Sequence, residues 1–209
     1  MNILRRHWFD LGMVLALGII FYLGLNHLDT LTLLLWINLL SLFIHQFEEY
    51  RYPGGFPRMM NTVMFASDQP DRYPLNANTA LIINLGVGWL FYSLAVLFGE
   101  RLIWLAIAVI LVSTGNFIAH TFLFNIKGKT RYFPGMVSAI LLFLPISVYF
   151  FFLVIKGNLA TPLDWILGLV LGIALNYLGI FKVIDWLKNK NSIYIFKEKA
   201  NNTPPNTNI

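Results

Sequence analysis

The chain contains no cysteine, and this excludes three kinds of chemistry. It forms no disulfide, it holds no metal through thiolates, and it has no cysteine nucleophile. Any metal would have to be bound by histidine, carboxylate, amide or carbonyl groups. The sequence also lacks a phosphate-binding glycine loop, a serine nucleophile elbow and the HExxH pattern of zinc proteases.

Charged residues are scarce. They make up 12% of the 209 residues, whereas 57% are hydrophobic. A soluble domain of this length needs more polar side chains to cover its surface, so the composition predicts an integral membrane protein in contact with the lipid bilayer. The net charge of +5 does not indicate a nucleic-acid partner, because the basic residues form no stripe interleaved with aromatic residues.

Six stretches are apolar and long enough to cross a bilayer as helices. They predict an all-α fold, a polytopic membrane protein with six transmembrane helices. The predicted spans are residues 8–26, 30–50, 79–98, 102–124, 137–155 and 162–182.

The basic residues lie mostly on one side of this topology. Thirteen of the fifteen fall at the N-terminus, in the second and fourth loops or at the C-terminal end, and only Arg101 and Lys156 fall on the other side. Basic residues are enriched in cytoplasmic loops. The sequence therefore predicts a multi-pass protein of the cell membrane with both termini in the cytoplasm.

The loops and the tail complete the predicted domain organisation. In the longest loop, residues 59–65 have helical spacing and predict a short interfacial helix, and Asn78 is expected to cap the third span. From about Lys188 the chain is rich in Asn, Lys and Pro. We therefore expect a membrane domain over residues 1–187 and a disordered cytoplasmic tail over residues 188–209.

Three ionisable residues interrupt the end of the second span. His45, Glu48 and Glu49 are spaced i, i+3 and i+4, so they share one face of a helix. Ionisable groups at membrane depth are costly and usually face a bundle interior or a wet cavity. A helix C-terminus also disfavours carboxylates. This cluster is the predicted functional site.

The fourth span brings a second set of polar residues to the same depth. It carries Asn116 and His120 at i, i+4, with His120 about as far from the cytoplasmic end as His45. His45, Glu48, Glu49 and His120 are candidate ligands for a divalent metal such as Fe, Zn or Mn. Glu48, Glu49 and Asn116 are candidate catalytic residues of a metal-dependent membrane hydrolase or oxidoreductase with a lipidic or apolar substrate.

Other functions are compatible with these residues. The same groups can titrate in a proton-coupled or ion-coupled transporter, although the outer halves of the second and fourth spans are almost wholly apolar. They can also form a satisfied polar core in a binding or scaffold protein. In that case Glu48 and Glu49 reach cytoplasmic water or pair with Arg51 and Arg58.

The ordered set of motifs resembles the HXXEE domain family. His45, Glu48 and Glu49 match its His-x-x-Glu-Glu motif, and the resemblance covers about residues 33–145. It implies a multi-pass membrane protein whose biochemical function is not established. The further matching segments are residues 50–57, Asn84, residues 116–120 and residues 132–135.

Overall fold

The computed structural model describes residues 2–99 and 101–196. Within these ranges every regular element is a helix. In this described part of the chain, six helices are long and apolar enough to cross a membrane, so the predicted number of spans is confirmed. They are Ile3–Leu25, Thr30–Tyr50, Ala77–Phe98, Ile103–Gly128, Met136–Lys156 and Pro162–Leu187.

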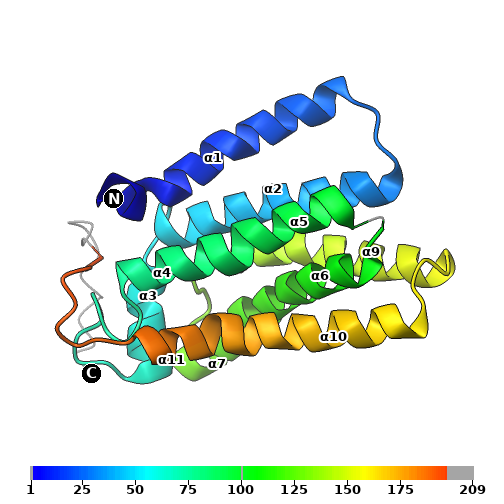
Figure 1. Ribbon diagram of the computed structural model, residues 1–209. Coiled ribbons are helices and arrows are strands. Elements are labelled where there is room, and N and C mark those ends of the chain that lie inside the picture. Colours follow the sequence, from blue (N-terminus) through cyan, green and yellow to red (C-terminus); the bar gives the residue numbers. More distant parts are fainter. Residues whose placement is uncertain (1, 100, 197–209) are drawn as a thin grey trace.

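The spans form one antiparallel bundle (Figure 1). Helix α1 (Asn2–Leu25) begins and helix α11 (Val183–Leu187) ends at the same end, where the long connections also lie. The other end carries the short connections, where capping residues begin the next helix. Asp29 caps α2 (Thr30–Tyr50) by accepting hydrogen bonds from Leu31 N and Thr32 N.

One predicted cap differs from the structure. The third span begins at Ala77, and its cap is Asn76 rather than Asn78. The Asn76 side chain accepts hydrogen bonds from the backbone N–H groups of Asn78 and Thr79, both at 3.0 Å. Either asparagine has the side chain that a cap requires. The extended backbone of Asn76 decides between them.

The second and fourth spans form the centre of the bundle. About half of each is buried, whereas the first and the sixth are mostly exposed. The sixth span packs against the fourth through two glycines, Gly168 and Gly172. A Cβ atom on Gly168 would lie 2.6 Å from Ile107 Cγ2, and one on Gly172 would lie 2.8 Å from Leu111 Cδ1. Small residues at these positions allow the two backbones to approach.

Four of the spans contain a π-helical turn. These turns are η2 (Asn84–Trp89), η3 (Ala119–Leu123), η4 (Ala139–Phe143) and η5 (Tyr177–Lys182). A π-turn inserts an extra residue into a helix and often marks a functional site. Here η3 contains His120 and η2 begins at Asn84, so two of the turns carry polar residues that the sequence singled out.

The longest loop folds back onto the bundle. The predicted short helix is present as α3 (Phe56–Met59) and η1 (Met60–Met64), with Met60 and Asn61 buried. The Asn61 amide fixes the rest of the loop, because it donates to Pro70 O and Leu75 O and accepts from Leu75 N, at 2.8 to 2.9 Å. This segment therefore covers the charged end of the bundle.

The first part of the predicted disordered tail also contacts this end. Residues 188–196 form no helix, but Tyr194 O accepts a hydrogen bond from Ala77 N at 3.0 Å and Phe196 N donates to Asp71 O at 2.9 Å. These backbone bonds hold the segment against the third span and the long loop. The rest of the predicted tail, residues 197–209, lies outside the described residues.

Candidate metal centre

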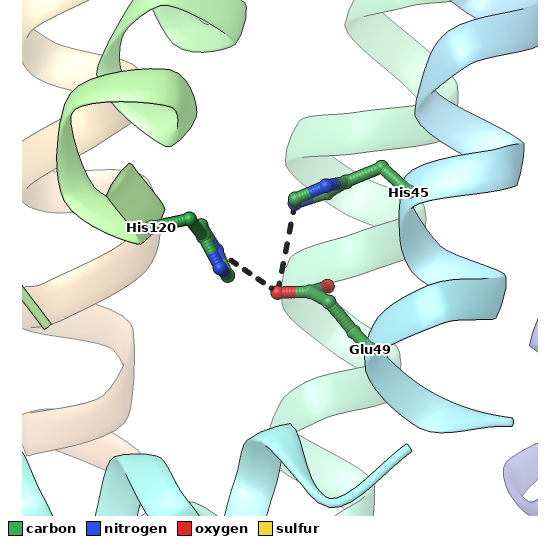
Figure 2. A group of neighbouring side chains, drawn as sticks. All are labelled: His45, Glu49 and His120. Atoms are coloured by element: carbon green, nitrogen blue, oxygen red, sulfur yellow. Dashed lines mark ion pairs between the residues drawn. The ribbon is translucent and has the colours of Figure 1, made fainter. Parts of the chain in front are cut away.

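The structure brings together three of the four predicted metal ligands (Figure 2). His45 and Glu49 lie one turn apart on α2, and His120 faces them from η3. Glu49 Oε1 lies 3.6 Å from His45 Nε2 and 3.2 Å from His120 Nε2. One ligand atom from each residue lies within 4.8 Å of the others. All three side chains are buried, and together they could hold a metal ion.

The fourth predicted ligand, Glu48, has a different set of partners. Its carboxylate accepts hydrogen bonds from Ser138 N at 2.7 Å, Ser138 Oγ at 2.5 Å and Val137 N at 3.1 Å. These donors lie at the start of the fifth span, where α8 (Met136–Ser138) leads into η4 and α9 (Leu144–Lys156). Glu48 therefore lies in the last turn of its own helix, but its carboxylate lies at the N-terminus of another, where a carboxylate is favoured.

Tyr132 supplies a further donor to Glu48, with its hydroxyl 3.0 Å from Glu48 Oε1. Burial raises the pKa of Tyr132, and the neighbouring Glu48 carboxylate raises it further. The phenol therefore stays protonated and donates. With every one of these donors engaged, Glu48 is held as an anion at the edge of the His/Glu group and contributes no ligand atom to it.

Ser138 connects Glu48 to the metal-binding group and decides which nitrogen of His45 carries the proton. Its hydroxyl has one hydrogen, which it donates to Glu48, so it accepts from His45 Nδ1 at 2.9 Å. His45 Nε2 is then left with a lone pair that faces Glu49. That nitrogen is buried and has no hydrogen-bond partner among the described residues. A buried lone pair directed at a carboxylate can be satisfied by a proton or by a metal ion between the two groups.

A small cavity of about 70 Å³ adjoins the group. His45 and Glu49 line it together with amide side chains, which are Gln46, Asn84 and Asn116. Liquid water occupies about 30 Å³ per molecule, so there is room for about two waters. The cavity is therefore large enough for a water or a small polar group of a substrate beside the metal-binding atoms.

The amides around the cavity are fixed by hydrogen bonds. Gln46 Nε2 donates to Asn84 Oδ1 at 2.9 Å, and Gln46 Oε1 accepts from Trp89 Nε1 at 2.8 Å. Asn116, a predicted catalytic residue, donates to Val112 O at 3.0 Å and so keeps a fixed orientation. Asn176 does not line this cavity, and its side chain donates a hydrogen bond to Leu111 O at 3.3 Å across a helix contact.

Aromatic rings and one glycine close the site on its other sides. His120 stacks on Phe56 with centroids 5.3 Å apart, and His45 lies 4.8 Å from Phe143. Gly135 has a φ of +97°, and a Cβ atom there would lie 2.6 Å from His120 Nδ1 and 2.7 Å from His45 Cε1. Only glycine lets the loop backbone pass this close to both imidazoles.

Sequence reasoning missed Ser138 and did not assign a role to Gly135. Both lie in or just after the residue 132–135 segment that carries part of the family resemblance. A serine three residues after a glycine at the start of a span is a usable signal, because hydroxyls at helix starts often bond backbone or carboxylate groups. Its pairing with Glu48 depends on the loop conformation, which residue spacing alone does not specify.

The fold and the site define a class: an all-helical, membrane-type bundle with a buried His/Glu group. Residues 36–150 match the model of a family described as HXXEE, a protein of unknown function with HXXEE motif. The match covers more than half of the chain, and the chain belongs to this family. No curated protein and no solved structure matches it.

Proposed function

We propose that this protein is a metal-dependent membrane enzyme in which His45, Glu49 and His120 hold one divalent ion and in which a lipidic or apolar substrate reacts. The observation that carries this proposal is the unpartnered Nε2 atom of His45, which faces Glu49 inside a buried site. Three protein ligands with an adjoining cavity are typical of catalytic sites, whereas structural metal sites are usually closed by four ligands.

We infer that the reaction is a hydrolysis. A bound zinc, iron or manganese ion would lower the pKa of a water molecule and polarise a substrate carbonyl or phosphoryl oxygen. Glu49 would bind through Oε1, the atom nearest both imidazoles, and its other oxygen would accept the proton of the attacking water. Asn84 and Asn116 would orient the polar part of the substrate in the cavity.

A second chemistry is supported by the donor set. Two histidines and one carboxylate are also the ligands of non-haem Fe(II) oxygenases. Iron at this site would make the protein an oxidoreductase, with dioxygen and a reductant as co-reactants. The identity of the native metal therefore separates the two reactions.

A transporter is less well supported. It would need a polar path from the metal-binding group to the other end of the bundle. Between the second, fourth and fifth spans that end is filled by a buried apolar cluster that includes Leu34, Leu35, Ile103, Ile107 and Phe150. The positively charged loops and both ends of the described chain lie at the end nearer the group, which supports a cytoplasmic placement of the termini.

Elemental analysis of the detergent-purified protein tests the proposal. We expect about one bound ion per chain and hydrolysis of a membrane-soluble ester. A chelator should remove the ion and abolish the hydrolysis, and adding back the native metal should restore both. Absence of stoichiometric Fe, Zn or Mn, with the same metal content in a His45→Ala variant, would contradict it. Stoichiometric iron together with oxygen consumption would instead indicate an oxidoreductase.

Glu48 acts through His45 in this proposal, so Glu48→Gln is expected to weaken metal binding by about 10-fold to 100-fold, the usual effect of losing a residue that orients a ligand. In this variant the Ser138 hydroxyl faces a neutral amide instead of a carboxylate. Its hydroxyl hydrogen is then directed less strongly away from His45, so the proton on His45 Nδ1 is fixed less strongly. Competition with a chelating dye measures the affinity. Asp68→Asn, an exposed acid in the long loop, is the control and is expected to bind metal normally.

A further inference from the structure

A second cavity lies at the charged end of the bundle. It has a volume of about 460 Å³ and is formed where α1 begins, where α2 ends and where the long loop enters α3. Pockets that bind drug-sized ligands have volumes of about 300 to 1,000 Å³. This cavity is therefore large enough for a ligand headgroup, unlike the small cavity beside the metal-binding group.

Arginine dominates the charge of this pocket. Arg5, Arg6, Arg51 and Arg58 line it, and among the described residues Asp71 is the one acid in its lining. Guanidinium groups bind phosphate and carboxylate through paired hydrogen bonds. Such a concentration of arginine at one cavity favours an anionic ligand.

The acids described near the pocket are fewer than its arginines. Asp71 is already bonded to Arg72, whose Nη2 donates to Asp71 Oδ2 at 2.7 Å and holds the pKa of Asp71 below its ordinary value. Asp10 pairs with Arg51 at 3.2 Å. Four arginines and one aspartate are among the described residues that line the pocket, so these lining residues carry a net positive charge.

Part of the basic surface is also held in place. Arg5 Nε donates to Asn78 Oδ1 at 2.9 Å, and its guanidinium lies 4.1 Å from the centre of the Tyr194 ring. Fixing a long side chain before binding lowers the entropy cost of the complex. The described part of the C-terminal segment therefore contributes to the pocket by orienting Arg5.

The other wall of the pocket is aromatic. Trp8, Phe9, Tyr50 and Phe196 line it, and the Trp8 and Tyr50 rings pack edge to face with centroids 4.8 Å apart. The rest of α1 presents exposed apolar side chains such as Val14 and Phe21 along its length. A ligand with a charged head in the pocket would thus have an apolar surface on which to lay a hydrocarbon chain.

From this arrangement we propose that the pocket binds the phosphate-bearing headgroup of an anionic membrane lipid. The arginines recognise the phosphate, and the aromatic wall and the outer face of α1 receive the start of the acyl chains. The site does not depend on the metal. It lies close to the proposed reaction centre, however, because Tyr50 lines both this pocket and the small cavity next to Glu49.

Binding is measured with purified protein in phosphatidylcholine nanodiscs, titrated with phosphatidic acid that carries a fluorophore on its acyl chain. We expect saturable binding to the unaltered protein. The double variant Arg6→Gln/Arg58→Gln is expected to bind at least about tenfold more weakly, since it loses two charged partners of the phosphate. The matched control, Lys129→Gln/Arg131→Gln, removes two exposed charges outside the pocket and is expected to bind normally.

Three results would overturn the proposal. The labelled lipid could bind no better than labelled phosphatidylcholine, the two double variants could lose affinity equally, or glycerol 3-phosphate and inorganic phosphate could compete as strongly as unlabelled phosphatidic acid. The last result would make the ligand a soluble phosphate compound rather than a lipid. Glu49→Gln is expected to leave lipid binding unchanged, so a failure of the metal proposal would not be mistaken for a failure of this one.

Discussion

Replacement of Glu49 by glutamine is expected to weaken metal binding by at least about a hundredfold. The loss of a residue that merely orients a ligand already costs about 10-fold to 100-fold, and Glu49 is the only anionic member of the group. Glutamine has nearly the same shape, so the packing around the side chain is preserved. His120→Ala removes a different ligand and is expected to give a loss of similar size.

Thermal unfolding with and without metal separates a lost ligand from a damaged fold. A metal at about 100 times its Kd stabilises the folded protein by about 2.7 kcal/mol, which raises the Tm of the unaltered protein. In the Glu49→Gln protein we expect this increase to disappear while the Tm without metal stays the same or rises, because a buried charge has been removed. Ser113→Ala, which alters a buried residue of α6 (Ile103–Ile118) away from the group, should retain the increase.

An equal metal-dependent rise in Tm for Glu49→Gln and the unaltered protein would count against the metal centre. A protein that binds no metal in any form, but unfolds at lower temperature when Glu49 is replaced, would instead be a binding or scaffold protein with a polar core. The two measurements together therefore distinguish the enzyme from that alternative.

Much of this fold follows from the sequence because its main signal is long apolar runs. Each predicted span is present, and the second was placed at the residues that the structure gives, Thr30–Tyr50. The residues at which the spans end are less predictable. The fourth span continues to Gly128 and the sixth to Leu187, beyond their apolar cores, because polar and basic residues at these ends still form helical turns.

The site was predictable in part for the same reason. Hydropathy and topology place His45 and His120 at one depth, and helical periodicity places Glu49 on the face of His45. Periodicity treats Glu48 as equivalent to Glu49, and the structure distinguishes the two. The start of the fifth span supplies several hydrogen-bond donors to the Glu48 carboxylate. The position of these donors depends on the preceding loop, whose sequence has no periodic pattern.

The π-turns mark a second limit of prediction from spacing. The interval between Asn116 and His120 was counted as one turn of a regular α-helix, but the π-turn η3 begins at Ala119. An extra residue in the turn changes the direction in which the following side chains point. His120 faces Glu49 from this π-turn, and the spacing of a regular α-helix does not predict that direction.

Gly135→Ala is expected both to destabilise the protein and to abolish tight metal binding. The backbone there has a φ of +97°, a conformation that costs a residue with a side chain about 1 to 3 kcal/mol. The added methyl group would also lie 2.6 Å from His120 Nδ1 and Cε1 and 2.7 Å from His45 Cε1. Since both rings are enclosed by buried aromatic side chains, they can make room only by leaving their positions around Glu49.

Gly55→Ala is the matched control for this experiment. Gly55 has nearly the same backbone conformation, with a φ of +94°, but a Cβ atom there would meet no atom of the described residues within 4 Å. Both variants therefore introduce backbone strain, and only Gly135→Ala also places a methyl group against the imidazoles. We expect Gly55→Ala to lower the Tm and keep its metal affinity, whereas Gly135→Ala lowers both. Equal metal affinity in the two variants would mean that the loop does not pass against His45 and His120, and the centre would then lack the geometry on which its proposed chemistry depends.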